Sequence, residues 1–214
     1  EFDMKTLIIG ATGQIGKMTT EKMLASGHDV VALVRDKSKL TALESNNLTI
    51  VEQDLENDFS RAFEGVEQVI FSAGSGGATG ADKTLLIDLW AAVKAINYAV
   101  DAKVKHFIMV SSIGADAPDN IESSIKPYLV AKHMADQHLI NSELNYSIVR
   151  PGTLLDDAAT GRLTTTRPAT RQDAVINRED VANTLLYLAE HTPKKPQVFE
   201  LFNGDKSIYD LLDA

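Results

Sequence analysis

Short apolar runs, rich in β-branched residues, alternate with helical segments through the first 150 residues of the chain. The runs that we interpret as strands cover residues 5–10, 29–34, 48–53, 66–73, 105–112 and 145–150. Strands that are apolar almost throughout are typical of a parallel sheet covered by helices on both faces. Right-handed crossovers between parallel strands leave few topologies. The pattern therefore predicts an α/β fold built on a doubly wound parallel sheet.

The pattern changes after the sixth strand. Residues 151–177 are rich in turn-forming residues and only weakly periodic, and we interpret them as an irregular segment on the substrate side of the sheet. Beyond them we expect a helix, a strand and a last short helix, over 178–191, 197–202 and 207–214. No repeat or linker divides the chain, so residues 4–214 are expected to form a single domain. Residues 1–3 are interpreted as a remnant of an expression vector.

The composition narrows the classes of partner. The chain has 214 residues, of which 44% are hydrophobic and 24% are charged, as is ordinary for a soluble globular protein. Its formal net charge of -9 argues against nucleic acid and membrane surfaces as partners, because both are anionic. The absence of cysteine excludes disulfides and thiolate metal sites. With no signal peptide and no apolar run of membrane-spanning length, we expect a cytoplasmic protein with a small-molecule substrate.

A glycine-rich loop, "GATGQIGK" (10–17), follows the first strand and opens a helix. Its G-x-x-G-x-x-G spacing is a variant of the dinucleotide-binding fingerprint, in which bare backbone approaches a pyrophosphate and the helix packs close to the strand. Free N–H groups at the helix N-terminus also favour phosphate. A tight turn with incidental glycines is the alternative. The cofactor contacts expected from this loop are Gly10, Thr12, Gly13, Gln14, Ile15 and Gly16.

The second strand ends in "ALVRDK" (32–37), where the preference between NAD and NADP is usually decided. A carboxylate about 20 residues beyond the glycines binds the ribose hydroxyls of NAD, whereas an arginine can hold the 2′-phosphate of NADP. Arg35 follows the strand directly and Asp36 comes one residue later, with Lys37 and Lys39 close by. We therefore predict NADP, with NAD less favoured. A solvated surface charge is the alternative role for Arg35.

Two further loops are expected at the cofactor. Asp54 and Leu55 follow the third strand, where the carboxylate could accept from the adenine amino group and the leucine could pack on the ring. A cap on the loop is the alternative for Asp54. Ala73 and Gly74 begin the segment "AGSGGATG" (73–80) after the fourth strand, and its glycines let backbone pass near the middle of the cofactor. The same segment could be a mobile lid, and the two interpretations are compatible.

The segment "PYLVAK" (127–132) places Tyr128 four residues before Lys132 on a predicted helix, so the two side chains share a face. A phenol with a pKa of about 10 is a poor base at neutral pH. A nearby ammonium group and an oxidised nicotinamide would both stabilise the phenolate and lower that pKa. Alternatively, the tyrosine anchors the helix through a backbone hydrogen bond and the lysine is a solvated charge. Ser111 and Ser112 end the preceding strand at the same edge of the sheet.

Taken in order, "GATGQIG", "VRD", "FIMVSS", "YLVAK", "IVRPGTL" and "NREDVA" resemble the short-chain dehydrogenase/reductase superfamily. The chain is most similar to its small atypical branch of NAD(P)-binding, NAD-dependent epimerase/dehydratase-like proteins, from Met4 onward. The resemblance implies a Rossmann fold. It also implies that Tyr128 is the general acid/base, that Lys132 holds the nicotinamide ribose and lowers the tyrosine pKa, and that Ser112 orients the substrate oxygen. Ser111 is the alternative to Ser112.

Two more motifs follow the sixth strand. In "RPG" (150–152), Pro151 and Gly152 resemble the turn of this branch that brings backbone near the nicotinamide, while Arg150 is equally well explained as structural. In "NREDVA", Asn177 is expected to cap a helix, with two carboxylates in its first turn facing the helix dipole, Glu179 and Asp180.

Four polar residues are expected to contribute less. Asp156 and Asp157 lie in the irregular segment, and adjacent carboxylates are more often solvated than paired for acid–base chemistry. His133 and His138 are five positions apart on the predicted helix, so they do not share a face as two metal ligands need. We therefore expect no metal site.

The resemblance implies an oxidoreductase that uses NADPH to reduce a small carbonyl or quinone-like compound. One alternative is an NADP(H)-binding sensor or regulatory protein without turnover. A second is a sugar-nucleotide epimerase or dehydratase, which the lack of a larger carboxyl-terminal lobe disfavours. We expect a monomer or a homodimer, the latter formed through the predicted helices over 85–100 and 126–141, as in many members of the superfamily.

Overall fold

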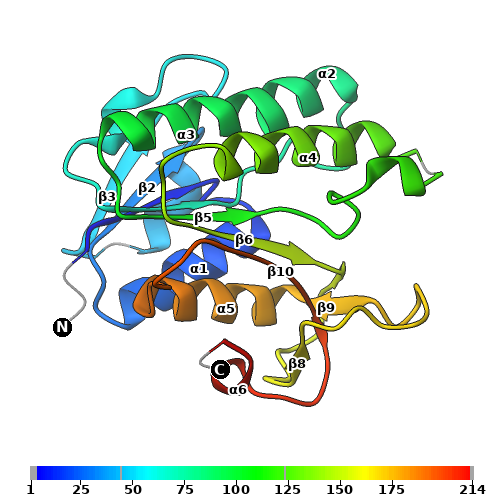
Figure 1. Ribbon diagram of the computed structural model, residues 1–214. Helices are drawn as coiled ribbons and strands as arrows, with labels where there is room; N and C mark the ends of the chain where they lie inside the picture. The colour runs from blue at the N-terminus through cyan, green and yellow to red at the C-terminus, as the bar shows by residue number, and fades with distance from the viewer. Residues whose placement is uncertain (1–3, 44, 123, 213–214) are drawn as a thin grey trace.

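The structure is a computed structural model that describes residues 4–43, 45–122 and 124–212 (Figure 1). The segment interpreted as a vector remnant, and residues 213–214 of the last predicted helix, lie outside this part of the chain. An eight-stranded sheet forms the centre, in the order β3-β2-β1-β4-β5-β6-β10-β8. The strands in that order are Leu48–Glu52, Val30–Val34, Thr6–Ile9, Gln68–Phe71, His106–Val110, Tyr146–Pro151, Gln197–Asn203 and Leu163–Thr164. All are parallel except β8, which confirms the predicted doubly wound sheet.

Helices cover both faces of the sheet (Figure 1). One face carries α2 (Ala81–Lys83), the π-helical segment η3 (Thr84–Ala91), α3 (Ala92–Asp101) and α4 (Lys126–Ile140), and the other carries α1 (Gln14–Ala25) and α5 (Arg178–Glu190). The connections contain three 3-10 turns and a last helix, η1 (Lys37–Leu43), η2 (Ser60–Phe63), η4 (Pro118–Asn120) and α6 (Ile208–Leu212). None of the described helices is long and apolar enough to cross a membrane.

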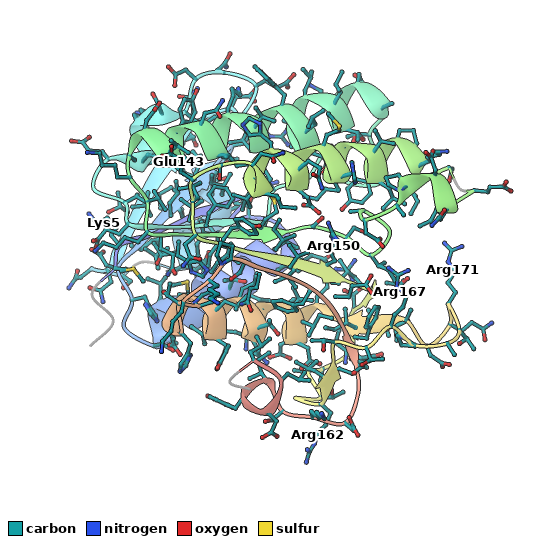
Figure 2. The ribbon with its side chains drawn as sticks, in the orientation of Figure 1. Lys5, Glu143, Arg150, Arg162, Arg167 and Arg171 are labelled. Atoms are coloured by element: carbon teal, nitrogen blue, oxygen red, sulfur yellow. The ribbon has the colours of Figure 1, made fainter. Side chains whose placement is uncertain are left out.

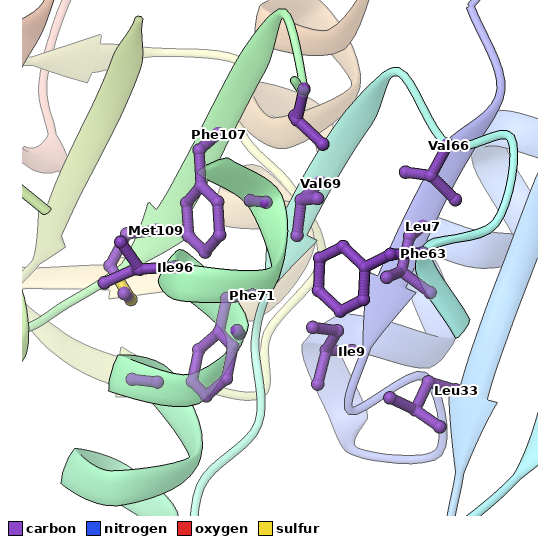
Figure 3. Packing of buried hydrophobic residues seen from close by; sticks show 14 of the residues in the cluster. Leu7, Ile9, Leu33, Phe63, Val66, Val69, Phe71, Ile96, Phe107 and Met109 are labelled. Atoms are coloured by element: carbon purple, nitrogen blue, oxygen red, sulfur yellow. The ribbon is translucent and has the colours of Figure 1, made fainter. Parts of the chain in front are cut away.

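The strands are buried on both faces because alternate side chains enter two separate hydrophobic clusters. Leu7 and Ile9 of β1 lie in the cluster beneath α3 and α4, with Phe71 and Phe107 from the neighbouring strands (Figure 3). Ile8 lies in the opposite cluster, with apolar residues of α1 and α5. This two-sided burial explains why the strands are almost continuously apolar in sequence.

The order of the strands creates a crevice at the carboxyl edge. From β1 the chain builds outward through β2 and β3, and then returns to place β4 on the other side of β1. Ile9 at the end of β1 is in register with Leu33 of β2 on one side and Phe71 of β4 on the other. The loops that follow β1 and β4 therefore diverge at this point, which is where open α/β sheets bind ligands.

The segment over 151–177 is largely irregular, as predicted, but it contains short strands that the sequence did not reveal. β7 (Thr153–Leu155) and β9 (Val175–Asn177) form a separate parallel pair, and β8 pairs antiparallel with β10 at the edge of the main sheet. Strands of two or three residues are too short to show a period, so only their partners identify them. The predicted helix over 85–100 is present, but its first half is π-helical.

Candidate functional site

Two of the three glycines in the loop after β1 are required by close packing. Gly10 has a φ of +86°, and a Cβ there would lie 2.6 Å from the Cα of Ala73. A Cβ on Gly16 would lie 2.1 Å from the carbonyl oxygen of Gly10. Gly13 differs, because its nearest neighbour would be 3.4 Å away, an ordinary contact. Gly10 and Gly16 therefore bring β1, β4 and α1 together, while Gly13 leaves its backbone open at the N-terminus of α1.

A cavity of about 360 Å³ opens over this loop, at the carboxyl ends of β1, β2, β3 and β4. Its walls include many of the predicted cofactor contacts, namely Gly10, Thr12, Gly13, Arg35, Asp54, Leu55, Ala73 and Gly74. The walls also include Lys39, which the sequence placed nearby, Ser75 and Thr79 of the predicted 73–80 segment, and Lys83, which the sequence did not identify. The cavity thus combines bare backbone, hydroxyl groups and cations, which are the groups that bind phosphates and ribose.

The charge at the β2 end of the cavity is positive. Arg35 and Lys39 line it, and Arg35 forms no ion pair with the described residues. Asp36 does not line the cavity, because its Oδ1 accepts hydrogen bonds from the hydroxyl and the backbone N–H of Ser38, at 2.6 and 3.0 Å. These bonds lower the pKa of Asp36 below its usual value. The carboxylate of Asp36, which would favour NAD, therefore forms hydrogen bonds within a local turn.

The two loops beyond β3 and β4 have their own internal bonds. Asp54 Oδ1 accepts a hydrogen bond from the backbone N–H of Glu56 at 2.9 Å, which is the loop cap considered as an alternative. Asp54 also lines the cavity. Asp88, from the middle of η3, accepts from the hydroxyl of Ser75 at 2.7 Å and from its backbone N–H at 3.3 Å. The start of the glycine-rich segment is thereby fastened to η3.

Lys132 is not a solvated charge, because only 2% of the residue is exposed. Its Nζ lies 3.9 Å from Met109 Sδ and 5.8 Å from the centre of the Phe71 ring, and it donates to no oxygen of the described residues. Burial lowers the pKa of Lys132, while the carboxylates of Asp136 and Asp88 act in the opposite direction. Three strong donors of a buried ammonium group thus meet only a sulfur atom and an aromatic face.

Tyr128 lies one turn before Lys132 on α4, and its hydroxyl forms no hydrogen bond within the described chain. The backbone anchor considered as an alternative is therefore absent from this part of the protein. The expected lowering of the Tyr128 pKa by Lys132 is also not found. Burial, and then the carboxylates of Asp88 and Asp136, raise the pKa of Tyr128 far above its usual value. The protein's own groups keep the phenol protonated.

The two candidate serines differ in their burial and in their hydrogen-bond partners. Ser111 is buried and donates its hydroxyl hydrogen to Asp136 Oδ2 at 2.7 Å. The same oxygen accepts a hydrogen bond from Arg150 Nε at 3.1 Å, and the terminal Nη2 of this arginine lies 3.1 Å from it in an ion pair. Ser112 is partly exposed, and its hydroxyl donates only to the neighbouring carbonyl of Ile113 at 3.0 Å. Ser112 is therefore the more available of the two, and Arg150 has a structural partner.

Several predicted cofactor contacts lie outside the walls of the cavity, and their contact with the cofactor stays a prediction. They are Gln14, Ile15, Gly16, Ser111, Lys132, Pro151 and Gly152. Packing explains Gly152, since a Cβ there would lie 2.5 Å from the carbonyl oxygen of Ala174. Gln14 reaches Asp156 at 3.4 Å, and Asp156 also pairs with Arg178 at 2.6 Å. This contact joins the glycine loop to the irregular segment.

The first turn of α5 holds that segment in place. Asn177 occupies the predicted cap position, but its side chain donates to the carbonyl of Ala158 at 3.0 Å instead of capping the helix. The carboxylate of Asp180 accepts from the backbone N–H groups of Thr160 and Gly161, both at 2.9 Å. Glu179 accepts from the backbone N–H of the preceding residue, Ala159, at 3.1 Å. The acidic residues expected to face the helix dipole therefore also position a loop.

Sequence reasoning missed the two buried carboxylates, Asp88 and Asp136. Asp136 is four residues after Lys132 and eight after Tyr128, so helical spacing alone could have placed it on their face. Asp88 is the single charged residue in the apolar run "TLLIDLWA" (84–91), and that isolation was the available signal. Both are almost fully buried, which could not be read from the sequence.

Comparisons with known proteins identify the family to which the chain belongs. A family model described as NAD(P)H-binding matches residues 10–192. The uncharacterized sugar epimerase YhfK of Bacillus subtilis strain 168 is 39% identical over 213 residues, which cover 98% of this chain and 99% of that protein. A Bacillus halodurans structure named for the NAD-dependent epimerase/dehydratases has a TM-score of 0.92 and 40% identity, with 98% and 99% coverage. ChuY of Escherichia coli O157:H7, named an anaerobillin reductase, has a TM-score of 0.78 and 26% identity, with 95% and 98% coverage.

Proposed function

The chain belongs to the NAD(P)H-binding family of small Rossmann-fold proteins, and we propose that it uses NADPH to reduce a small carbonyl or quinone-like compound. The cofactor would lie across the carboxyl edge of the sheet, with its phosphates at the open backbone of Gly13 and its adenosine end between Arg35 and Leu55. The resemblance to a named reductase over nearly the whole chain supports this reaction class.

The observation that carries the proposal is the state of Lys132. A buried ammonium group needs acceptors for its hydrogens, yet this one has no oxygen partner among the described residues. The two hydroxyl groups of a nicotinamide ribose are acceptors of the right chemistry. Tyr128 lies one turn away on the same helix face, so a ribose held by Lys132 would bring the reacting end of the cofactor toward the phenol.

The roles of the side chains follow from their protonation. When bound, NADPH would supply the hydride that the carbonyl carbon accepts. Tyr128 gives its hydroxyl proton to the carbonyl oxygen, which yields the alcohol, and Ser112 holds that oxygen through a hydrogen bond. The reduction starts from the protonated phenol, which is the form that Tyr128 holds at neutral pH, although its raised pKa makes it a weaker proton donor.

The preference for NADPH over NADH is argued from charge. Arg35 and Lys39 at the cavity wall could pair with a 2′-phosphate, while Asp36 lies outside the wall and its Oδ1 is bonded to Ser38. We therefore propose NADP(H) as the physiological cofactor.

The test is NADPH consumption with a panel of small aldehydes, ketones and quinones, for wild type and for Tyr128→Phe. The proposal predicts loss of turnover in Tyr128→Phe with unchanged NADPH affinity, because only the proton donor is removed. Tyr209→Phe, at an exposed tyrosine, is the matched control and should keep full activity. Equal turnover in Tyr128→Phe would remove the tyrosine from the mechanism. Tight NADPH binding without turnover of any substrate would favour the sensor role instead.

The name of the Bacillus subtilis relative supports a second candidate, a sugar-nucleotide epimerase. Such a reaction begins by removing a hydroxyl proton from the sugar, which requires the phenolate of Tyr128. Burial of Tyr128, and then the carboxylates of Asp88 and Asp136, disfavour the phenolate as a starting state, so this candidate ranks below the reductase, which starts from the protonated phenol. It would be recognised by cofactor that stays bound through purification and is regenerated in each turnover.

A further inference from the structure

Asp88 is a buried carboxylate without an ion-pair partner in the described chain. Only 2% of it is exposed, and its bonds are the two from Ser75, both made by neutral donors. Neutral donors satisfy the lone pairs of a carboxylate, but they leave its charge uncompensated in a medium of low polarity. Asp88 also lies in the middle of η3, and π-helical segments occur often at functional sites.

Lys132 is the buried positive group on which Asp88 acts across the packing of η3 against α4, although the two form no ion pair among the described residues. Four charged residues belong to this region, of which Asp88, Lys132 and Asp136 are buried and Arg150 is partly exposed. Arg150 is paired with Asp136 at 3.1 Å, which leaves Asp88 to balance Lys132. The other neighbours of the lysine, Met109 from β5 and Phe71 from β4, are uncharged. Asp136 acts on Lys132 more strongly than Asp88, but Arg150 offsets its charge.

Asp88 also touches the wall of the cofactor cavity. Ser75, which it holds by two bonds, lines the cavity, and a Cβ on the neighbouring Gly74 would lie only 3.1 Å from Asp88 Oδ1. The carboxylate itself is not part of the lining. One buried group therefore contacts the cavity wall and also acts by its charge on Lys132 of the adjacent helix.

We propose that Asp88 is a positioning residue with two tasks. It holds the 73–75 wall of the cofactor cavity in place, and its negative charge balances the positive charge of Lys132. Cofactor affinity then depends on a carboxylate that does not touch the cofactor. The part that concerns affinity rests on the proposed function, whereas the part that concerns Lys132 does not. The two parts are therefore measured separately.

The first measurement is the pKa of Lys132 in the cofactor-free protein, followed by NMR of ¹³Cε-labelled lysine, with Lys132→Met to assign the signal. Asp88→Asn should lower this pKa by about one unit, because an opposite charge is removed while the shape is kept. Asp88→Glu, which retains a carboxylate, should restore most of the shift. Ser75→Ala is the matched control, because it loosens the wall without changing a charge. A Lys132 pKa that is the same in wild type and Asp88→Asn would overturn the proposal.

The second measurement is calorimetric titration of the same variants with NADPH between pH 7 and pH 9.5. Asp88→Asn should bind about tenfold more weakly at pH 7 and lose further affinity as the pH rises, since its lysine deprotonates earlier. Ser75→Ala should weaken binding equally at every pH. A parallel pH profile for Asp88→Asn and wild type would count against the proposal. If wild type itself fails to bind NADPH, the proposed function fails, and the NMR titration still decides the link between Asp88 and Lys132.

Should Asp88→Asn not fold, Ser75→Ala remains decisive for the cavity wall. It must leave the pKa of Lys132 at the wild-type value and reduce the affinity for NADPH. Wild-type affinity in this variant would contradict the fastening role of Asp88.

Discussion

Gly13 and Gly16 lie three residues apart in one loop, yet the structure assigns them different tasks. A methyl group on Gly16 would sit 2.1 Å from the carbonyl oxygen of Gly10 and 2.8 Å from the hydroxyl of Ser72. A methyl group on Gly13 would meet that carbonyl at 3.4 Å, and Gly13 has an ordinary extended backbone with φ −68° and ψ 165°. Gly16→Ala should therefore damage the fold, while Gly13→Ala should damage cofactor binding alone.

The magnitudes follow from these distances. In Gly16→Ala the new Cβ is more than 1 Å short of ordinary contact with backbone that cannot move independently, so the cost should reach about 3 kcal/mol. For a chain of this length that corresponds to a fall in Tm of about 6–12 °C. In Gly13→Ala the lost freedom of the unfolded chain stabilises by about 0.5–1 kcal/mol, and the poorer helix cap costs about as much. The Tm of Gly13→Ala should stay within about 3 °C of wild type.

The assay is thermal unfolding of both variants without cofactor, followed by calorimetric titration with NADPH. Gly13→Ala should bind at least about tenfold more weakly, because the methyl group occupies the cavity where backbone is expected to meet the pyrophosphate. Gly77→Ala is the control, since a Cβ there would have no neighbour within 4 Å and its φ is not positive. A Gly16→Ala protein as stable as wild type, or a Gly13→Ala protein with full affinity, would refute this division of tasks.

Two further predictions concern buried polar groups. Burial lowers the pKa of His106 to about 4, so the unfolded chain takes up this proton first as the pH falls. The free energy of unfolding should therefore drop by about 3 kcal/mol between pH 6.5 and pH 4, and His106→Asn should lack this component in denaturant titrations. Arg150→Met leaves the buried carboxylate of Asp136 without its cation and should cost about 3–5 kcal/mol in the same assay, whereas Arg162→Met, at the outer rim of the molecule (Figure 2), should cost almost nothing.

The fold could be predicted because its signals are local. Strands such as Thr6–Ile9 are buried on both faces, so every residue carries the pattern, and the glycines at 10, 13 and 16 mark the turn into α1. The identity of the cofactor loops followed from their place after successive strands, and most of those residues line the cavity. The helix over 126–140 likewise brought Tyr128 and Lys132 onto one face by spacing alone.

What could not be predicted depends on contacts between distant segments. Burial, and then Asp88 and Asp136, raise the pKa of Tyr128, and only the packing of η3 against α4 brings Asp88 to this region. The expectation of a lowered tyrosine pKa considered the positive charge of Lys132 and omitted these two carboxylates. The sequence identified Asp180 as an acidic residue in the first turn of a helix. It did not predict the bonds of Asp180 to residues 160–161, because about twenty residues of weakly periodic sequence separate them.

We propose that the cavity at the carboxyl edge binds NADP(H) through Arg35, and calorimetric titration of wild type and Arg35→Ala with NADPH and with NADH examines this binding. Wild type should bind NADPH more tightly than NADH. Arg35→Ala should lose roughly tenfold or more in affinity for NADPH and change little for NADH, because only the 2′-phosphate loses a partner. Failure of wild type to bind either cofactor, or an equal effect of the substitution on both, would contradict this proposal.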